Sequence, residues 1–354
     1  MSNASLLLST PLILLPLCVQ AATLTGLSFS HNDWEIACDN TGTCRAAGYQ
    51  SDDDQLAVSV LLTRKAGPHE PVTGELTIGD YDNEEVLKKL PPVLNLSLRI
   101  NGSNIGEVDV DKNDLAAELS GKQVTALLAA LPGKSSIEWV AGEYRWHLSD
   151  KGAAAVLLKM DEFQGRIGTQ GALIKKGSKG ENAVLPPLPM PVVIAGAVAK
   201  PRPDDNKILT DQSNAMRDAL RATKEADECS DLLEKEAADA ELSVTRLTDS
   251  KLLASAHCWS GAYNSGYGYW VINATPPYQP VLVTNSGSEY NEGSITASHK
   301  GRGLGDCWSS ESWTWDGKQF VYTESSSTGL CKLVTPGGAW SLPTLVTEIR
   351  RPPR

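Results

Sequence analysis

The cysteines constrain this chain more than any other feature. The sequence has seven cysteines, of which six remain if residues 1–21 are removed. Cys18 follows an apolar run, residues 6–17, and precedes Val19-Gln20-Ala21, residues of the size that a signal peptidase accepts. An even set of cysteines in an exported chain predicts disulfide bonds that form in an oxidising compartment.

The first 21 residues are interpreted as a signal peptide cleaved near Ala21. Their apolar run of about a dozen residues is shorter than the roughly 20 needed to span a bilayer as a helix. The segment has no Lys or Arg, which departs from the usual charged start of a signal peptide. Lipidation of Cys18 is an alternative, but Pro16 and Leu17 are not the small residues that usually precede a lipidated cysteine. The sequence therefore predicts a periplasmic protein with no transmembrane segment after cleavage.

Charge and length limit the class of protein. The net charge is -11, and residues 204–241 hold twelve acids and five bases, so this stretch supplies -7 of it. An acidic balance argues against a nucleic-acid partner. The mature chain of about 333 residues is long enough for two domains of ordinary size.

Residues 22–176 are predicted to form a β-sandwich-like domain with two short helices. Residues 93–100 alternate apolar and polar side chains, Asn101-Gly102 is a strong turn signal, and residues 105–110 fit the returning strand. Ser120 and Gln123 form a capping-box pattern before the first helix, 124–131, and the second helix is expected over 153–163.

A proline-rich stretch, residues 177–206, is predicted to be an extended linker to a second domain, 207–354. We expect Thr210-Asp211 to cap a helix over 215–221, and the acidic stretch 225–240 also favours helix. The remainder combines aromatic residues with Gly, Ser, Thr and Asn, a pattern typical of an antiparallel β-meander. The predicted fold class is therefore mainly β, a β-rich α+β protein.

The six remaining cysteines are assigned to three disulfides. Cys38 and Cys44 flank a turn-forming segment and are predicted to pair. Six cysteines permit 15 pairings, and the most economical choice pairs Cys307 with Cys331 across a hairpin that turns at Asp316-Gly317, and Cys229 with Cys258. A zinc site at Cys38 and Cys44 would need two further ligands, and His31 is the only nearby candidate, so a disulfide is favoured.

Familiar catalytic and metal-binding motifs are not present. Gly-x-Ser-x-Gly, the nucleophile motif of many hydrolases, does not occur. Residues 109–120 begin like a calcium loop, but Asp114 and Ser120 stand where the motif requires Gly and Glu. The five histidines occur singly and are interpreted as surface or hydrogen-bonded residues: His31, His69, His147, His257 and His299. No catalytic residue, metal or cofactor is predicted.

The best candidate for ligand binding is the aromatic cluster of the second domain, because flat rings stack on sugars or peptides, although core packing is the more common role of such rings. The tripeptide Cys258-Trp259-Ser260 recurs as Cys307-Trp308-Ser309, which hints at a duplicated unit. The candidate binding residues are Trp259, Tyr263, Asn264, Trp270, Trp308, Trp313 and Trp315.

Four sequence elements carry a resemblance to known families. Residues 29–38 with Cys44, and residues 146–155, make the N-terminal half similar to the invasion-associated locus B family of exported bacterial proteins. Together with residues 258–264 and 313–320, they make the whole chain resemble DUF1176, a family of unknown function. The resemblance implies an envelope or periplasmic protein of a Gram-negative bacterium and carries no catalytic residues.

These observations favour a non-enzymatic, disulfide-stabilised periplasmic protein that binds an envelope component or another protein. The alternative is a hydrolase that cleaves cell-wall glycan or peptide with carboxylates as acid and base. A structural envelope factor without a small ligand is a third interpretation.

Overall fold

The computed structural model describes residues 24–79, 88–223, 229–233 and 242–352, so the predicted signal peptide lies outside the described residues. Strands make up 42% of the described residues and helices 16%. The prediction of a mainly β protein with few helices is confirmed.

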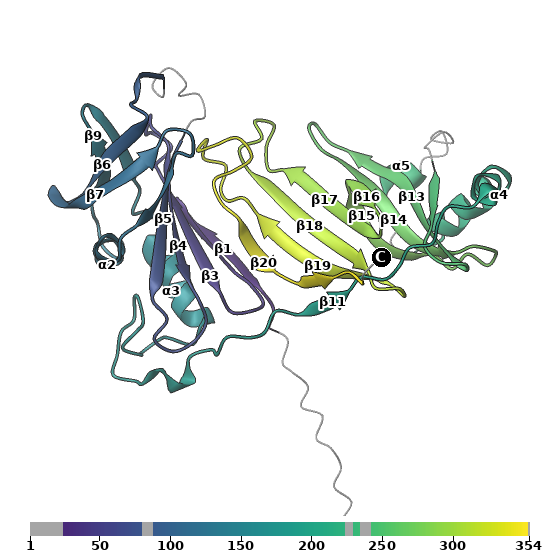
Figure 1. Cartoon of the computed structure of the whole chain (residues 1–354), viewed down its shortest axis with the longest axis horizontal. Coiled ribbons are helices and arrows are strands. Elements are labelled where there is room, and N and C mark those ends of the chain that lie inside the picture. The colour runs from purple at the N-terminus through teal and green to yellow at the C-terminus, as the bar shows by residue number, and fades with distance from the viewer. Residues whose placement is uncertain (1–23, 80–87, 224–228, 234–241, 353–354) are drawn as a thin grey trace, which may run out of the picture.

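Two antiparallel sheets form the N-terminal part (Figure 1). The first contains, in sheet order, β1 (Leu27–His31), β2 (Trp34–Cys38), β3 (Cys44–Tyr49), β4 (Val58–Arg64), β5 (Val72–Ile78) and β8 (Ala116–Leu119). The second contains β10 (Tyr144–Leu148), β9 (Ile137–Ala141), β6 (Val93–Ile100) and β7 (Ser103–Asp111).

A single hydrophobic core joins these two sheets and two helices, α2 (Gly121–Ala130) and α3 (Ala153–Phe163). Three fully buried tryptophans from both sheets, Trp34, Trp139 and Trp146, are among its largest side chains. Burial of large aromatic side chains supplies much of the stabilisation of such a core.

The predicted local signals of this part are confirmed. Asn101 and Gly102 have positive φ angles of 50° and 81° and turn β6 into β7, as a two-residue hairpin requires. Ser120 caps α2, and its side chain and that of Gln123 complete the capping box.

The proline-rich stretch lies along the N-terminal part before it reaches the C-terminal part. Its residues include a short 3-10 helix, Glu181–Ala183, and β11 (Val192–Ile194), which pairs in parallel with β21 (Glu348–Arg350). The buried Arg166 side chain holds the start of this stretch, because it donates to Gly67 O (2.6 Å) and pairs with Glu181 (3.4 Å).

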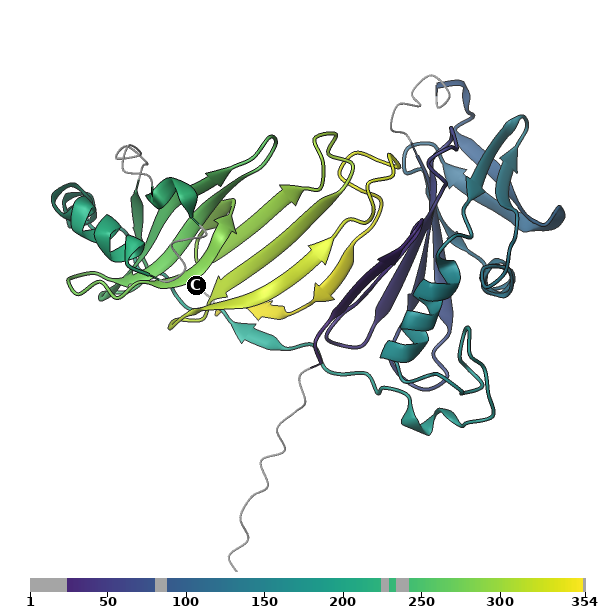
Figure 2. The same cartoon turned by 180° about the vertical axis from the view of Figure 1, so that it is seen from behind.

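Two further antiparallel sheets form the C-terminal part. The four-stranded sheet contains β12 (Ser243–Arg246), β13 (Lys251–Ser260), β14 (Ser265–Asn273) and β15 (Val281–Gly287). The five-stranded sheet contains β16 (Glu289–Asn291), β17 (Ser294–Lys300), β18 (Trp308–Trp315), β19 (Phe320–Ser327) and β20 (Leu342–Leu345). The two sheets follow one another as a long curved array, which is seen from both sides in Figures 1 and 2.

One face of the four-stranded sheet is covered by α4 (Pro203–Arg221) and α5 (Ser230–Leu233). The predicted start of the first helix at Thr210-Asp211 is wrong, since α4 begins at Pro203. Pro203 fits the first helical position, and the Asp205 carboxylate accepts the backbone N–H of Arg202 at 2.7 Å. Most of the predicted acidic helix, 225–240, lies outside the described residues.

The segment that links β19 to β20, together with the start of β20, packs on the outer face of the first sheet. Val334 and Leu342 join a buried cluster with Ala47, Tyr49 and Leu61. Around this cluster, polar contacts join the same two regions: Lys332 Nζ to Asp33 (2.8 Å) and Asp52 (2.6 Å), Trp340 Nε1 to Ser59 Oγ (2.7 Å), and Asn40 to Val346 (2.8 and 3.1 Å). The N-terminal and C-terminal parts are therefore in extensive contact.

The structure contains three disulfides with the predicted pairing: Cys38–Cys44, Cys229–Cys258 and Cys307–Cys331. The third also agrees with its predicted hairpin, because β18 and β19 turn at Asp316, whose carboxylate accepts the N–H groups of Lys318 and Gln319.

Candidate functional site

Three of the predicted binding residues, Trp259, Tyr263 and Asn264, lie at the end of the β13–β14 hairpin. The hairpin turns over residues 261–264, where Gly261 N–H donates to Asn264 O (2.7 Å). The Asn264 amide then pairs with both backbone groups of Lys300, at 2.9 and 3.0 Å. The Tyr263 hydroxyl donates to Gly301 O at 3.3 Å. These bonds fix the hairpin end against the end of β17.

Trp259 is held above a glycine on the neighbouring strand. A Cβ atom at Gly266 would lie 2.4 Å from the indole ring, so only glycine leaves room for Trp259 there. The indole Nε1 donates to Asn285 O at 3.1 Å, and the ring centroid lies 5.4 Å from that of His299. The Trp259 side chain therefore lies across β14, reaches β15 through its hydrogen bond to Asn285, and packs against His299 of β17.

Trp308 approaches β17 at the next residue. Its Nε1 donates to Gly305 O at 3.0 Å, and Lys300 Nζ lies 5.5 Å from the centre of the ring. This distance is within the range of a cation–π interaction. Successive residues of β17, His299 and Lys300, thus contact the tryptophans of the two Cys-Trp-Ser tripeptides. We call Trp259, Tyr263, Asn264, Lys300 and Trp308 the hairpin-end surface.

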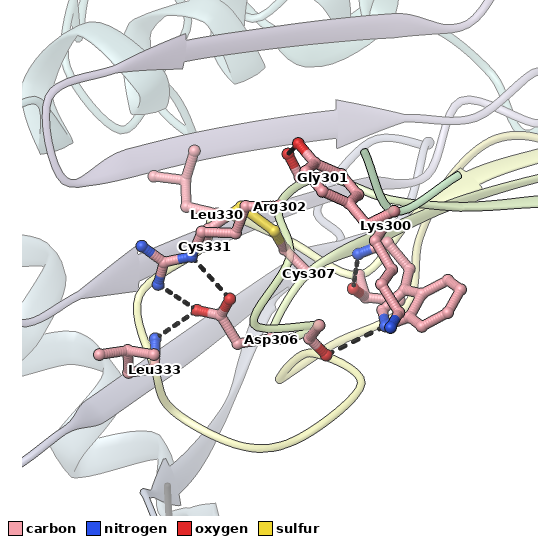
Figure 3. The surroundings of a disulfide bond; sticks show 12 residues. Lys300, Gly301, Arg302, Asp306, Cys307, Leu330, Cys331 and Leu333 are labelled. Carbon is pink, nitrogen blue, oxygen red and sulfur yellow. Dashed lines mark hydrogen bonds and ion pairs between the residues drawn. A yellow bond between two sulfur atoms is a disulfide. The ribbon is translucent and has the colours of Figure 1, made fainter. Parts of the chain in front are cut away.

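The connection between β17 and β18 is held by the Cys307–Cys331 disulfide and an ion pair (Figure 3). The fully buried Asp306 carboxylate accepts from Arg302 Nε at 2.7 Å and from Leu333 N–H at 2.8 Å. Burial raises the pKa of Asp306, but the hydrogen bonds from Arg302 and Leu333 outweigh it, so the pKa lies below its usual value. Asp306 is next to two cysteine sulfurs, but these are bonded to each other and are not thiolate ligands.

The remaining predicted binding residues are not at this surface. Trp270 and Trp315 are 0% and 1% exposed and belong to two separate hydrophobic clusters, so both offer a ligand no surface in this structure. Trp313 lies with Tyr322, with ring centroids 5.2 Å apart. The Tyr322 hydroxyl donates to Glu311 at 2.6 Å, and burial together with this bond raises the pKa of Tyr322 to about 12.

Sequence reasoning missed the residues that β17 contributes. His299 is separated by 40 positions from Trp259, and nothing local marks Lys300 as the partner of Asn264. Only the recurrence of Cys-Trp-Ser, whose two tryptophans contact successive residues of β17, is a usable signal in the sequence.

The comparisons with known proteins assign the chain to a family. The sequence pattern of the family described as "Protein of unknown function (DUF1176)" matches residues 28–347, and the chain belongs to this family. The chain is 29% identical to the "Uncharacterized protein YpfG" of Escherichia coli (strain K12) over 345 residues, which cover 89% of this chain and 91% of that protein. No solved structure matches the chain. In the described part of the chain, every helix is too short or too polar to cross a membrane.

Proposed function

We propose that this protein is exported to the periplasm and binds an envelope component through its hairpin-end surface. Three disulfides support export, because such bonds persist in oxidising compartments and are rare in the cytosol. The apolar segment before Ala21 supports a cleaved signal peptide. Membership of DUF1176 agrees with this assignment without naming a ligand.

The observation that carries the binding proposal is Tyr263. Its side chain is 47% exposed although its hydroxyl is bonded to Gly301 O. A ring fixed in place and half open to solvent loses little conformational freedom when a ligand stacks on it. Trp308 and Lys300 beside it add a partly exposed ring and a cation. This combination suits the sugar rings and the carboxylates of peptidoglycan.

The test is co-sedimentation of the purified mature protein with peptidoglycan sacculi. We expect Tyr263→Ala to weaken binding about 10-fold, equivalent to about 1.4 kcal/mol. Tyr322→Ala is the matched control, because Tyr322 on β19 is 39% exposed and does not belong to the hairpin-end surface. Equal binding by wild type and Tyr263→Ala, or no sedimentation of the wild type, would reject this proposal.

The alternative of a cell-wall hydrolase with two carboxylates has less support. Burial raises the pKa of Glu35 and of Asp161, which is a common property of general acids. Glu35, however, accepts from Tyr49 (2.8 Å) and from Leu330 N–H. Asp161 accepts the N–H groups of Leu173 and Ile174. Both carboxylates hold neighbouring segments together, which favours a structural role for each.

We also propose the domain division 22–176, 177–206 and 207–354, and a relationship of the first domain to the invasion-associated locus B family. The division is supported by separate hydrophobic clusters in the N-terminal and C-terminal sheets. Residues 29–38 support the second proposal. Separate expression of 22–176 would test the division, and failure of that fragment to fold would contradict it.

A further inference from the structure

Three polar side chains form a continuous hydrogen-bonded chain at the end of β13. The Asp231 carboxylate lies 2.7 Å from His257 Nδ1, and His257 Nε2 lies 3.2 Å from Ser260 Oγ. Ser260 is exposed, whereas His257 and Asp231 are partly buried, with side-chain exposures of 27% and 35%. A nucleophile that must meet a substrate needs access, and its supporting groups need fixed positions.

The Cys229–Cys258 disulfide fixes the position of Asp231. Cys258 lies next to His257 on β13, and Cys229 precedes α5, which carries Asp231. Ser230 Oγ donates to Cys258 O at 3.3 Å, and Arg221 Nε donates to Leu232 O at 2.7 Å. Asp231 is thus held from both sides, so its bond to His257 is part of the fold.

The donors and acceptors of the three residues are arranged in the order that general-base catalysis requires. An ionised carboxylate only accepts hydrogen bonds, so Asp231 requires the proton of the neutral imidazole on Nδ1. His257 Nε2 then has a free lone pair, which accepts the Ser260 hydroxyl. Tyr267 packs edge-on against the imidazole with centroids 5.2 Å apart and restricts its rotation.

We propose that Ser260, His257 and Asp231 form a catalytic triad that hydrolyses carboxylic esters. Ser260 is the nucleophile, His257 the general base, and Asp231 a positioning residue for His257. Triads are recognised by geometry and roles rather than by sequence order or motif, so the lack of Gly-x-Ser-x-Gly does not exclude this one. The inference adds a reaction to the binding role and departs from the prediction of a non-enzymatic protein.

The reaction balances with water as the only co-reactant. Ser260 Oγ bonds to the ester carbonyl carbon while its proton moves to His257 Nε2, and the carbonyl oxygen becomes an oxyanion. The carbon–alkoxide bond then breaks, and the alkoxide leaves as an alcohol with the proton from His257. Water attacks the acyl-serine in the same way, returns a carboxylic acid, and restores Ser260.

An ester is the substrate class that suits this site. Ester bonds have better leaving groups than amides and require less stabilisation of the transition state. The site lies at the hairpin end beside the exposed ring of Tyr267, which is 39% exposed. An open position of this kind accommodates an acyl group attached to a large molecule.

The test measures hydrolysis of p-nitrophenyl acetate by the oxidised mature protein. We expect turnover with an initial burst of p-nitrophenol, and a loss of about 100-fold or more in kcat/KM for Ser260→Ala and for His257→Gln. The double variant should be no slower than either single variant, because the two residues act as a unit. Asp231→Asn should lower kcat more than it raises KM.

Ser309→Ala is the matched control, since Ser309 follows the second Cys-Trp pair and is also exposed. It should keep the wild-type rate. Urea unfolding of each variant separates lost catalysis from lost folding. A wild-type rate no higher than that of Ser260→Ala, or full activity of His257→Gln, would overturn the proposal. Because p-nitrophenyl acetate is a small ester, this outcome is independent of peptidoglycan binding.

Discussion

The two Cys-Trp-Ser tripeptides share a sequence and differ in what their disulfides bring to them. Cys258 is bonded to Cys229, two residues before Asp231, and this bond brings a carboxylate to His257 and Ser260. Cys307 is bonded to Cys331, which lies between Leu330 and Lys332, residues that contact the first sheet. The first disulfide therefore assembles a polar group of three at the surface, and the second holds the contact between two parts of the molecule.

This difference shows that the partner of a cysteine matters more than the sequence around it. Trp259 and Trp308 contact successive residues of β17, His299 and Lys300, although the first tripeptide ends β13 and the second lies at the start of β18. Their serines do not have equivalent surroundings, because α5 supplies Asp231 only to the first. The same tripeptide therefore occurs in two different surroundings.

The largest effects should follow removal of each disulfide. Cys229→Ala/Cys258→Ala should lower the free energy of unfolding by about 3 kcal/mol, the usual effect for a ring of this size. It should also lower ester hydrolysis about 100-fold, because Asp231 is released from His257. Cys307→Ala/Cys331→Ala should cost a similar free energy and leave the hydrolysis rate of the folded protein unchanged. Urea unfolding measures the stability and steady-state kinetics the hydrolysis rate. An equal loss of hydrolysis in the two variants would contradict the different roles assigned to the two disulfides.

The contact beside the second disulfide should be the next most sensitive. Leu342 is 1% exposed in the cluster that β20 forms with the first sheet. Leu342→Ala should lower the free energy of unfolding by about 2–4 kcal/mol, since it leaves a cavity. Ile349→Ala, at a residue 40% exposed, is the control and should change it by less than about 1 kcal/mol. Equal effects would mean that this contact contributes little to stability.

Close packing under Trp259 gives a smaller effect. Gly266→Ala should lower the free energy of unfolding by about 1–3 kcal/mol, because the added methyl group meets the indole ring. Gly180→Ala is the control, as a Cβ there meets nothing within 4 Å. Near-ultraviolet circular dichroism should report the displaced indole, and an unchanged spectrum with unchanged stability would contradict the packing described for Trp259.

Acid should weaken the contacts beside the Cys307–Cys331 disulfide, because Asp306 holds them. Its pKa is lowered in the folded protein, so its stabilisation is present above the ordinary carboxyl pKa and is lost as pH falls through the lowered value. Asp306→Asn should therefore cost about 1–2 kcal/mol at pH 7, and the difference from wild type should narrow below about pH 4. Unfolding curves from pH 7 to pH 3 test this. A difference in free energy of unfolding between wild type and Asp306→Asn that widens in acid would contradict a lowered pKa of Asp306.

Local signals in the sequence predicted much of the fold. The Asn101-Gly102 turn and the Ser120 capping box act within a few residues, and both are confirmed. The start of α4 was predicted wrongly because Thr210-Asp211 resembles a cap, whereas Pro203 and Asp205 form the actual one.

The candidate site was predictable only in part, because its contacts depend on tertiary structure. Trp259, Tyr263, Asn264 and Trp308 were identified from their aromatic or polar character, but the same reasoning selected Trp270 and Trp315, which are buried. Periodicity does not distinguish a core ring from a surface ring at a strand end. Asp231 and His257 are 26 positions apart and meet through one disulfide, so His257 looked like an isolated histidine.

The most direct measurement of the central claim is the site of covalent modification by a phosphonate ester that reacts with activated serines. The oxidised mature protein would be treated with a fluorophosphonate, digested and mapped by mass spectrometry. The structure predicts an adduct on Ser260 that is lost in His257→Gln, and no adduct on Ser309. Equal modification of Ser260 and Ser309, or an adduct on Ser260 that persists in His257→Gln, would contradict the assignment of different roles to the two Cys-Trp-Ser tripeptides.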